Sequence, residues 1–190
     1  MDVDSKPQRY FNSIINMVKF GEILKHLIQM IIRVANRSDM PSVLSLIKEL
    51  ARFENDADAV EVKVENLVND GFDNQPAFQV YVAEVDEIIV GIALFYQRYS
   101  TWKGKSLHLE DLIVEEQSRG KGIGKALYSE VLKYAHEKKY KRVSWEVLDW
   151  NKPAIDFYEK SGAKILEGWK VVQMDEISLD YFIQNVERND

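Results

Sequence analysis

The stretch Arg119-Gly120-Lys121-Gly122-Ile123-Gly124 (RGKGIG) stands between an apolar run and a long amphipathic segment. Three glycines in five residues let the backbone come close to a ligand and turn its N–H groups toward it. The segment 120–139 has helical periodicity, and the unpaired N–H groups and dipole of a helix N-terminus favour anions. We therefore predict a cradle for a pyrophosphate, with Arg119, Lys121 and Lys125 available for further phosphate contacts.

Two common phosphate-binding motifs do not fit this stretch. A P-loop ends in Gly-Lys-Ser/Thr, whereas Gly124-Lys125 is followed by Ala126. A dinucleotide fingerprint has Gly-x-Gly-x-x-Gly after the first strand of a parallel unit, whereas here Gly-x-Gly-x-Gly follows a late strand. What remains is Arg-x-x-Gly-x-Gly before a long helix, with a glycine-rich turn that binds nothing as the alternative.

The composition sets limits on the class of protein. Of 190 residues, 46% are hydrophobic and 29% charged, which is typical of one folded domain. The formal net charge of −6 argues against a nucleic-acid binder, whose footprint is basic. The absence of cysteine excludes disulfides, thiolate metal sites and a cysteine nucleophile. The three histidines lack metal-ligand spacing, so we expect them to be structural or solvated and expect no metal.

The pattern of strands and helices predicts a single α/β domain with a mixed sheet. We expect strands at 31–35, 78–85, 88–96, 107–114, 142–148 and 169–174. We expect a first helix that is capped by Ser38 or Asp39 and a second that spans 62–70 and ends at Gly71. We expect further helices at 120–139, 153–161 and 178–186. The order mixes antiparallel hairpins with strand–helix–strand crossovers.

The first 29 residues form a separate appendage in this interpretation, with the domain spanning 30–190. Residues 10–29 have helical periodicity, but charged side chains interrupt the apolar run, which argues against a membrane span. No small-residue cleavage site follows, so a signal peptide is not expected. We predict a cytoplasmic protein with no membrane or nucleic-acid partner, in which 1–29 is a packing or dimerisation helix or upstream sequence before Met30.

From about Ile31 to Met174 the chain resembles the spermidine/spermine (diamine) N-acetyltransferase branch of the GNAT superfamily. The matching stretches are LIKELARFE (46–54), DGF (70–72), STWKGK (100–105), LEDLIV (109–114), the glycine loop, VLDWNKP (147–153), FY (157–158), SGA (161–163) and EGW (167–169). Within that branch, STWKGK and VLDWN are more similar to the paralogue that prefers thialysine. The resemblance implies a GNAT-like, mostly antiparallel, splayed sheet flanked by helices, and a homodimer.

The resemblance also implies acetyl-CoA as co-substrate. Its pantetheine arm would pair like an extra strand with the main chain of Leu112, Ile113 and Val114. The loop residues Gly120, Lys121, Gly122, Ile123, Gly124 and Lys125 would hold the pyrophosphate. Asn151, Lys152 and Pro153 would line the other side of the arm.

Acetyl transfer to an amine requires a neutral nitrogen, whereas a free alkylamine has a pKa of roughly 10.4. Glu110 precedes the strand segment expected to hold the thioester and is our candidate to remove the proton. Strand alternation predicts the opposite direction for Asp111, which we expect to be structural or a minor electrostatic contributor. Tyr158 resembles the family's general acid, and a main-chain N–H near Ile113 would bind the oxyanion.

Acidic and aromatic residues are the candidates for binding the amine. Glu54 and Glu167 match family positions that contact the distal ammonium group, and Phe53 stands where the polyamine enzyme has tyrosine. Trp102, Trp145 and Glu146 would complete a pocket for an alkylammonium group.

Three functions stay open on these residues. The favoured one is acetylation of a small cationic amine: thialysine, a lysine-like amine or a polyamine. The alternatives are acetylation of a protein lysine or N-terminus, and a catalytically silent acetyl-CoA-binding domain.

Overall fold

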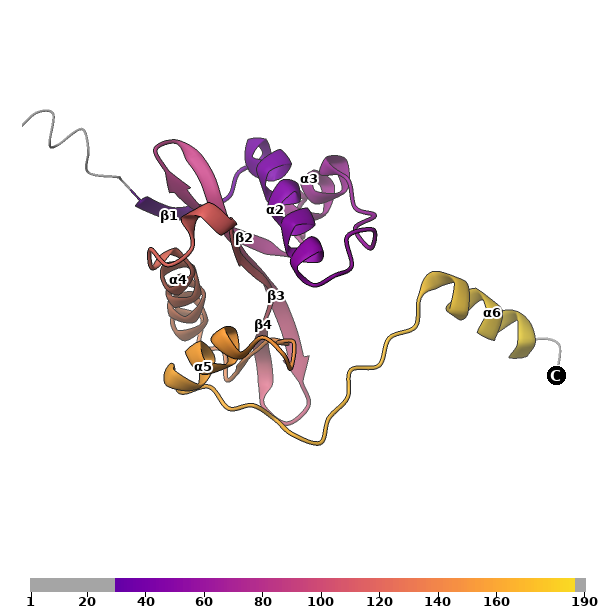
Figure 1. Cartoon of the computed structure of the whole chain (residues 1–190). Coiled ribbons are helices and arrows are strands. Elements are labelled where there is room, and N and C mark those ends of the chain that lie inside the picture. The colour runs from indigo at the N-terminus through magenta and orange to yellow at the C-terminus, as the bar shows by residue number, and fades with distance from the viewer. Residues whose placement is uncertain (1–29, 187–190) are drawn as a thin grey trace, which may run out of the picture. The chain divides into compact units, whose positions relative to one another are not determined.

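The structure is a computed structural model that describes residues 30–186 (Figure 1). The predicted appendage at 1–29, with its helix at 10–29, lies outside the described residues. The described chain forms two compact parts, residues 30–146 and 147–186. Within 30–186, no helix combines the length and apolar character that crossing a membrane requires.

A five-stranded sheet organises the first part, in the order β1-β2-β3-β4-β5. The strands are β1 (Met30–Val34), β2 (Gln79–Val85), β3 (Ile88–Ser100), β4 (Gly104–Val114) and β5 (Val143–Ser144). The helices are η1 (Arg37–Asp39), α2 (Met40–Phe53), α3 (Val64–Phe72), η2 (Glu116–Ser118) and α4 (Ile123–Glu137). The first four strands are antiparallel and β5 runs parallel to β4, which confirms the mixed, mostly antiparallel sheet.

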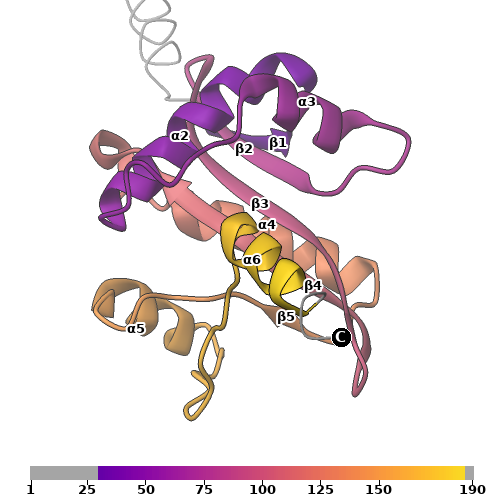
Figure 2. The same ribbon diagram turned by 90° about the vertical axis from the view of Figure 1, so that its right-hand side faces the viewer.

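Helices cover both faces of this sheet, with α2 and α3 on one side and α4 on the other (Figures 1 and 2). Paired residues on neighbouring strands share a face, so Val82, Ile92 and Ile113 lie together and pack with α2 and α3. Phe95 lies on the opposite face, where the centre of its ring is 5.3 Å from the centre of the Tyr134 ring on α4. Both faces of the sheet are therefore covered by helices, and the face toward α2 carries the site described below.

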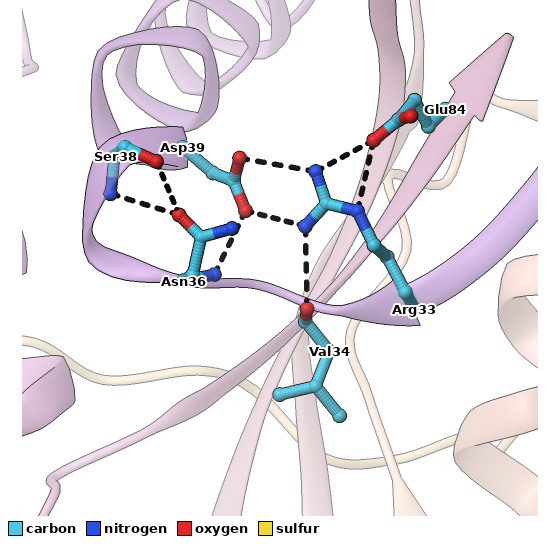
Figure 3. Close-up of polar contacts among 6 residues, drawn as sticks. All are labelled: Arg33, Val34, Asn36, Ser38, Asp39 and Glu84. Atoms are coloured by element: carbon cyan, nitrogen blue, oxygen red, sulfur yellow. Dashed lines mark hydrogen bonds and ion pairs between the residues drawn. The ribbon is translucent and has the colours of Figure 1, made fainter. Parts of the chain in front are cut away.

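An ion cluster joins the end of β1 to the start of α2 (Figure 3). Arg33 donates to Asp39 at 2.6 and 3.1 Å and to Glu84 on β2 at 2.8 and 2.6 Å. Arg33, and then the backbone N–H of Asn36, keep the pKa of Asp39 below its usual value. Because each partner is on a different element, the cluster fixes where α2 begins over the sheet.

Gly71 does not end α3, so that part of the prediction is wrong. The helix continues to Phe72, and Asp73 is its C-cap. A Cβ on Gly71 would lie 2.9 Å from the Phe78 ring. The glycine is therefore explained by the close approach of an aromatic side chain, which sequence cannot distinguish from a helix stop.

The strand predicted at 169–174 is also wrong. In the second part, α5 (Lys152–Lys160) and α6 (Glu176–Val186) are helices, but 169–175 has no regular structure. The segment is rich in residues that favour strands, but a strand also needs a hydrogen-bonded partner. Within 30–186 the segment pairs with none. Its apolar side chains, including Trp169 and Val172, are exposed.

Candidate active site

A β-bulge in β4 places two carboxylates on the same face of the sheet. Leu94 of β3 lies opposite Asp111, and Phe95 lies opposite Leu109, so Glu110 is the extra residue between them. Asp111 therefore shares the α2 face with Leu94, and Glu110 contacts side chains of that face too. The expectation that Asp111 points away from Glu110 is wrong, because the bulge interrupts the alternation on which it rests.

The Glu110 carboxylate is held by groups from β3 and β4. Tyr96 Oη donates to Glu110 Oε2 at 2.8 Å, and His108 Nε2 lies 3.4 Å from the same oxygen. Burial, followed by Glu110 itself, raises the pKa of Tyr96 to about 12, so this hydroxyl keeps its proton at neutral pH. Glu110 remains about half exposed (49%) and can therefore reach a substrate while anchored on one oxygen.

Three residues around Glu110 are absent from the predicted site residues: Tyr96, Arg98 and His108, the last of which is expected from the sequence to be structural or solvated. Arg98 Nη1 is 3.0 Å from His108 Nδ1, and the ring centres of Tyr96 and His108 are 5.2 Å apart. The signal available in the sequence is their spacing of two, which puts Tyr96 and Arg98 on one face of β3 and His108 on the same face of β4.

Asp111 and Glu54 extend the acidic group toward α2. Burial, followed by Glu110 and Glu54, raises the pKa of Asp111 to about 6. Glu54 is the C-cap of α2, and burial followed by Asp56 raises its pKa too. Glu110 and Glu54 both raise the pKa of Asp111, and a bound cation would reduce the repulsion among these carboxylates.

We expect Asp111→Asn to stabilise the protein at pH 8 but not at pH 4. A carboxyl whose pKa rises from 3.8 to about 6 on folding favours the folded state below pH 4, and this contribution is lost as the pH rises through 6. The ionised form then costs up to about 3 kcal/mol, which Asn removes, so Tm should rise by several degrees. Thermal unfolding at both pH values measures this.

Asp58→Asn, at an exposed loop position, makes the same charge change and controls for net charge. An equal gain in Tm at pH 4 and pH 8 for Asp111→Asn would contradict the explanation from ionisation.

The edge of β4 fits a strand-like ligand. β5 pairs with β4 only at Leu107 and His108. Beyond His108 no other strand of the described chain pairs with the side of β4 away from β3. The main chain at Leu112 and Ile113 therefore has a strand edge to offer a pantetheine arm, whereas the Val114 carbonyl already accepts from Arg119 Nε at 2.9 Å.

The glycine loop fits a pyrophosphate. Gly120 and Gly122 have φ values of 76° and 83°, and a Cβ built on either would meet nothing within 4 Å. Gly122 is the N-cap of α4, a helix of 15 residues, so the first N–H groups of the helix lie beside this open space. Lys121 and Lys125 are exposed there.

The Arg119 side chain contacts two residues of α2. Its Nη2 lies 3.5 Å from Glu49 on α2, and its guanidinium lies 5.5 Å from the centre of the Phe53 ring. Arg119 thus connects the glycine loop to the end of α2, next to Glu54. The predicted phosphate contact of Arg119 stays a prediction.

The other predicted residues of the first part lie in the β3–β4 turn and directly after β5. Trp102 is in the turn between β3 and β4 and is 82% exposed. Trp145 packs edge-on against Tyr128 of α4, with ring centres 5.6 Å apart. Glu146 instead acts electrostatically on His108. Trp145 therefore contacts the helix on the α4 face, while Glu146 affects the face that carries Glu110.

The predicted residues of the second part surround α5. The Asn151 side chain caps the helix by accepting from the Ala154 N–H at 3.3 Å, and Lys152 and Pro153 form its first turn. Tyr158 is buried, with its ring 5.3 Å from that of Phe157. Glu167 is exposed in a turn. Their roles toward the cofactor and amine stay predictions.

Comparison with known proteins identifies the class. The family described as "Acetyltransferase (GNAT) family" matches residues 25–163. Thialysine N-epsilon-acetyltransferase of Bos taurus is 40% identical over 149 residues, 73% of this chain and 88% of that protein. Spermidine/spermine N(1)-acetyltransferase-like protein 1 of Homo sapiens is 36% identical over 154 residues, 76% of this chain and 22% of that protein.

Among solved structures, an integron cassette protein from V. cholerae has the same fold, with a TM-score of 0.68 and 20% identity. The match covers 82% of this chain and 98% of that one. The chain belongs to the GNAT acetyltransferase family and is an N-acetyltransferase.

Proposed function

We propose that the chain transfers the acetyl group of acetyl-CoA to the primary amine of a small cationic molecule: thialysine, a lysine-like amine or a polyamine. The observation that carries this proposal is the group of carboxylates at Glu110, Asp111 and Glu54, beside the open edge of β4. The relatives named for thialysine and spermidine/spermine support the choice of amine.

Acetyl-CoA supplies an acetyl group activated as a thioester. In the proposed mechanism the acidic group attracts the ammonium form of the amine, and Glu110 accepts its proton, directly or through water. The neutral nitrogen then attacks without an enzyme-bound acetyl group. A main-chain N–H near Ile113 stabilises the oxyanion, and the Tyr158 hydroxyl gives a proton to the leaving sulfur. Direct attack needs no metal, so we expect a chelator to leave the rate unchanged.

The remaining predicted residues have the following roles in this proposal. Gly120–Lys125 and Arg119 hold the pyrophosphate, while Asn151, Lys152 and Pro153 line the cofactor arm. Phe53, Glu54, Glu146 and Glu167 contact the amine. The amine contacts predicted for Trp102, which is exposed in the β3–β4 turn, and for Trp145, which packs against Tyr128 of α4, have no support from these positions. Phe53 makes specificity for polyamines less direct, because it lacks the hydroxyl of the tyrosine in the polyamine enzyme.

A panel of amines with acetyl-CoA, followed by CoA release, tests the function. We expect thialysine to be acetylated with a higher kcat/KM than spermidine, whereas the reverse would indicate a polyamine role. Turnover of peptides but of no small amine would favour a protein acetyltransferase. Tight acetyl-CoA binding with no turnover of any acceptor would favour the silent binding domain and refute the proposal.

We expect Tyr158→Phe to lower kcat by about 100- to 10,000-fold and to leave the Kd for acetyl-CoA unchanged. The change removes one hydroxyl from a buried ring without altering its apolar packing. Single-turnover kinetics and calorimetric titration measure the two quantities. Tyr140→Phe, which removes a hydroxyl that donates to Gln97 on β3, is the control. An unchanged kcat would remove Tyr158 from the mechanism.

We further propose a cytoplasmic homodimer. The exposed apolar side chains of α6, including Ile177, Tyr181 and Phe182, support a self-association surface. Light scattering of the full chain and of a chain that starts at Met30 tests both the dimer and the proposal that 1–29 is an appendage. A monomer in both cases would contradict the dimer.

A further inference from the structure

We propose that His108 is a positioning residue that holds the Glu110 carboxylate through an Nε2–H donor directed at Oε2. This inference rests on the proposed function in assigning Glu110 its task. It also makes a claim about the protonation of one ring that can be measured without any turnover.

The contacts around the ring determine its tautomer. His108 Nδ1 lies 3.0 Å from Arg98 Nη1, and a guanidinium can only donate, so Nδ1 must accept. Ser144 Oγ, 3.4 Å from the same nitrogen, can donate to it as well. With Nδ1 accepting, a neutral ring carries its proton on Nε2, which faces Glu110 Oε2 at 3.4 Å.

The surroundings keep this ring neutral. His108 is only 6% exposed, and burial is the main cause that lowers its pKa, with Arg98 acting in the same direction. Glu110 and Glu146 oppose this shift without reversing it. A neutral ring that accepts at Nδ1 carries its single N–H on Nε2, and Glu110 Oε2 lies 3.4 Å from that nitrogen.

The consequence is a division of tasks between the two oxygens of Glu110. Tyr96 Oη on β3 donates to Oε2 at 2.8 Å, and His108 Nε2 on β4 lies 3.4 Å from the same oxygen. Oε1 is then directed by this anchoring and is the oxygen we assign to the proton of the amine. The 3.4 Å separation is expected to shorten when substrate binds, as contacts of this kind commonly do.

Nitrogen-15 NMR of the full-length protein labelled at histidine tests the tautomer. The chain has three histidines, so His108→Gln assigns the relevant signals. At pH 7 we expect the proton on Nε2, and we expect that signal to move in Glu110→Gln. A proton on Nδ1, a charged ring, or no response to Glu110→Gln would overturn the inference, whatever the activity of the protein.

A double-mutant cycle tests the positioning. We expect His108→Phe to lower kcat about 10-fold with no change in the KM for acetyl-CoA, and His108→Gln, whose amide N–H can replace Nε2–H, to regain most of it. In the Glu110→Gln background His108→Phe should have no further effect, and an additive loss would overturn the inference. His136→Phe, an exposed exchange on α4, is the control. If the wild type acetylates no amine but the ring has the expected tautomer, the proposed function fails and the contact of His108 with Glu110 stands.

Discussion

Gly122→Glu should weaken the binding of acetyl-CoA by at least about 100-fold, or about 2.7 kcal/mol. Gly122 is the N-cap of α4, and the Cβ position above it is open on the side where the first N–H groups of the helix are available. A glutamate there would place a side chain and a negative charge in the space proposed for the pyrophosphate. Calorimetric titration with acetyl-CoA measures the loss.

The chain offers a closely matched control in Gly104→Glu. Gly104 has nearly the same φ (82° against 83°) and also has nothing within 4 Å of its Cβ position. It lies at the start of β4, in the β3–β4 turn. Both substitutions therefore carry the same left-handed backbone cost, about 1–2 kcal/mol, and the same charge. Equal affinity losses in the two variants would contradict the cradle, because the effect would then come from the fold.

The sequence predicts the elements of this fold best where periodicity and turn chemistry agree. The strands predicted at 78–85 and 88–96 leave Asp86 and Glu87 as a two-residue turn, and both have the positive φ values that such a hairpin turn requires. Errors occur where a residue type serves a long-range contact. Gly71 lies inside α3 because Phe78 packs against it. The predicted strand at 169–174 lacks a partner, and pairing is a property of the whole fold.

In the candidate site, too, features set by neighbouring residues in the chain were predictable and features set by another strand were not. The glycine loop was predictable because its backbone conformation depends on neighbouring residues in the chain. The bulge at Glu110 was not, because its only sign is a register shift between Leu94 and Phe95 on another strand. That shift brings Asp111 to the same face as Glu110. It also explains why strand alternation predicts the wrong direction for Asp111.

Glu110→Gln should lower kcat by about 100- to 10,000-fold at neutral pH, the range expected when a general base is removed. The substitution keeps the size of the side chain, and its amide oxygen can still accept from Tyr96 Oη. The fold and the acetyl-CoA site should therefore be preserved, so the Kd for acetyl-CoA should stay within about twofold. Steady-state kinetics with the best amine of the panel and calorimetric titration measure the two quantities.

Glu65→Gln, at an exposed position of α3, makes the same chemical change away from the site and should leave kcat unchanged. Amine protonation supplies a second comparison. If Glu110 removes the proton, raising the pH toward the amine pKa of roughly 10.4 should recover part of the lost rate, because more of the amine arrives neutral. A loss in Glu110→Gln that is the same at every pH would instead indicate that Glu110 only binds the ammonium group.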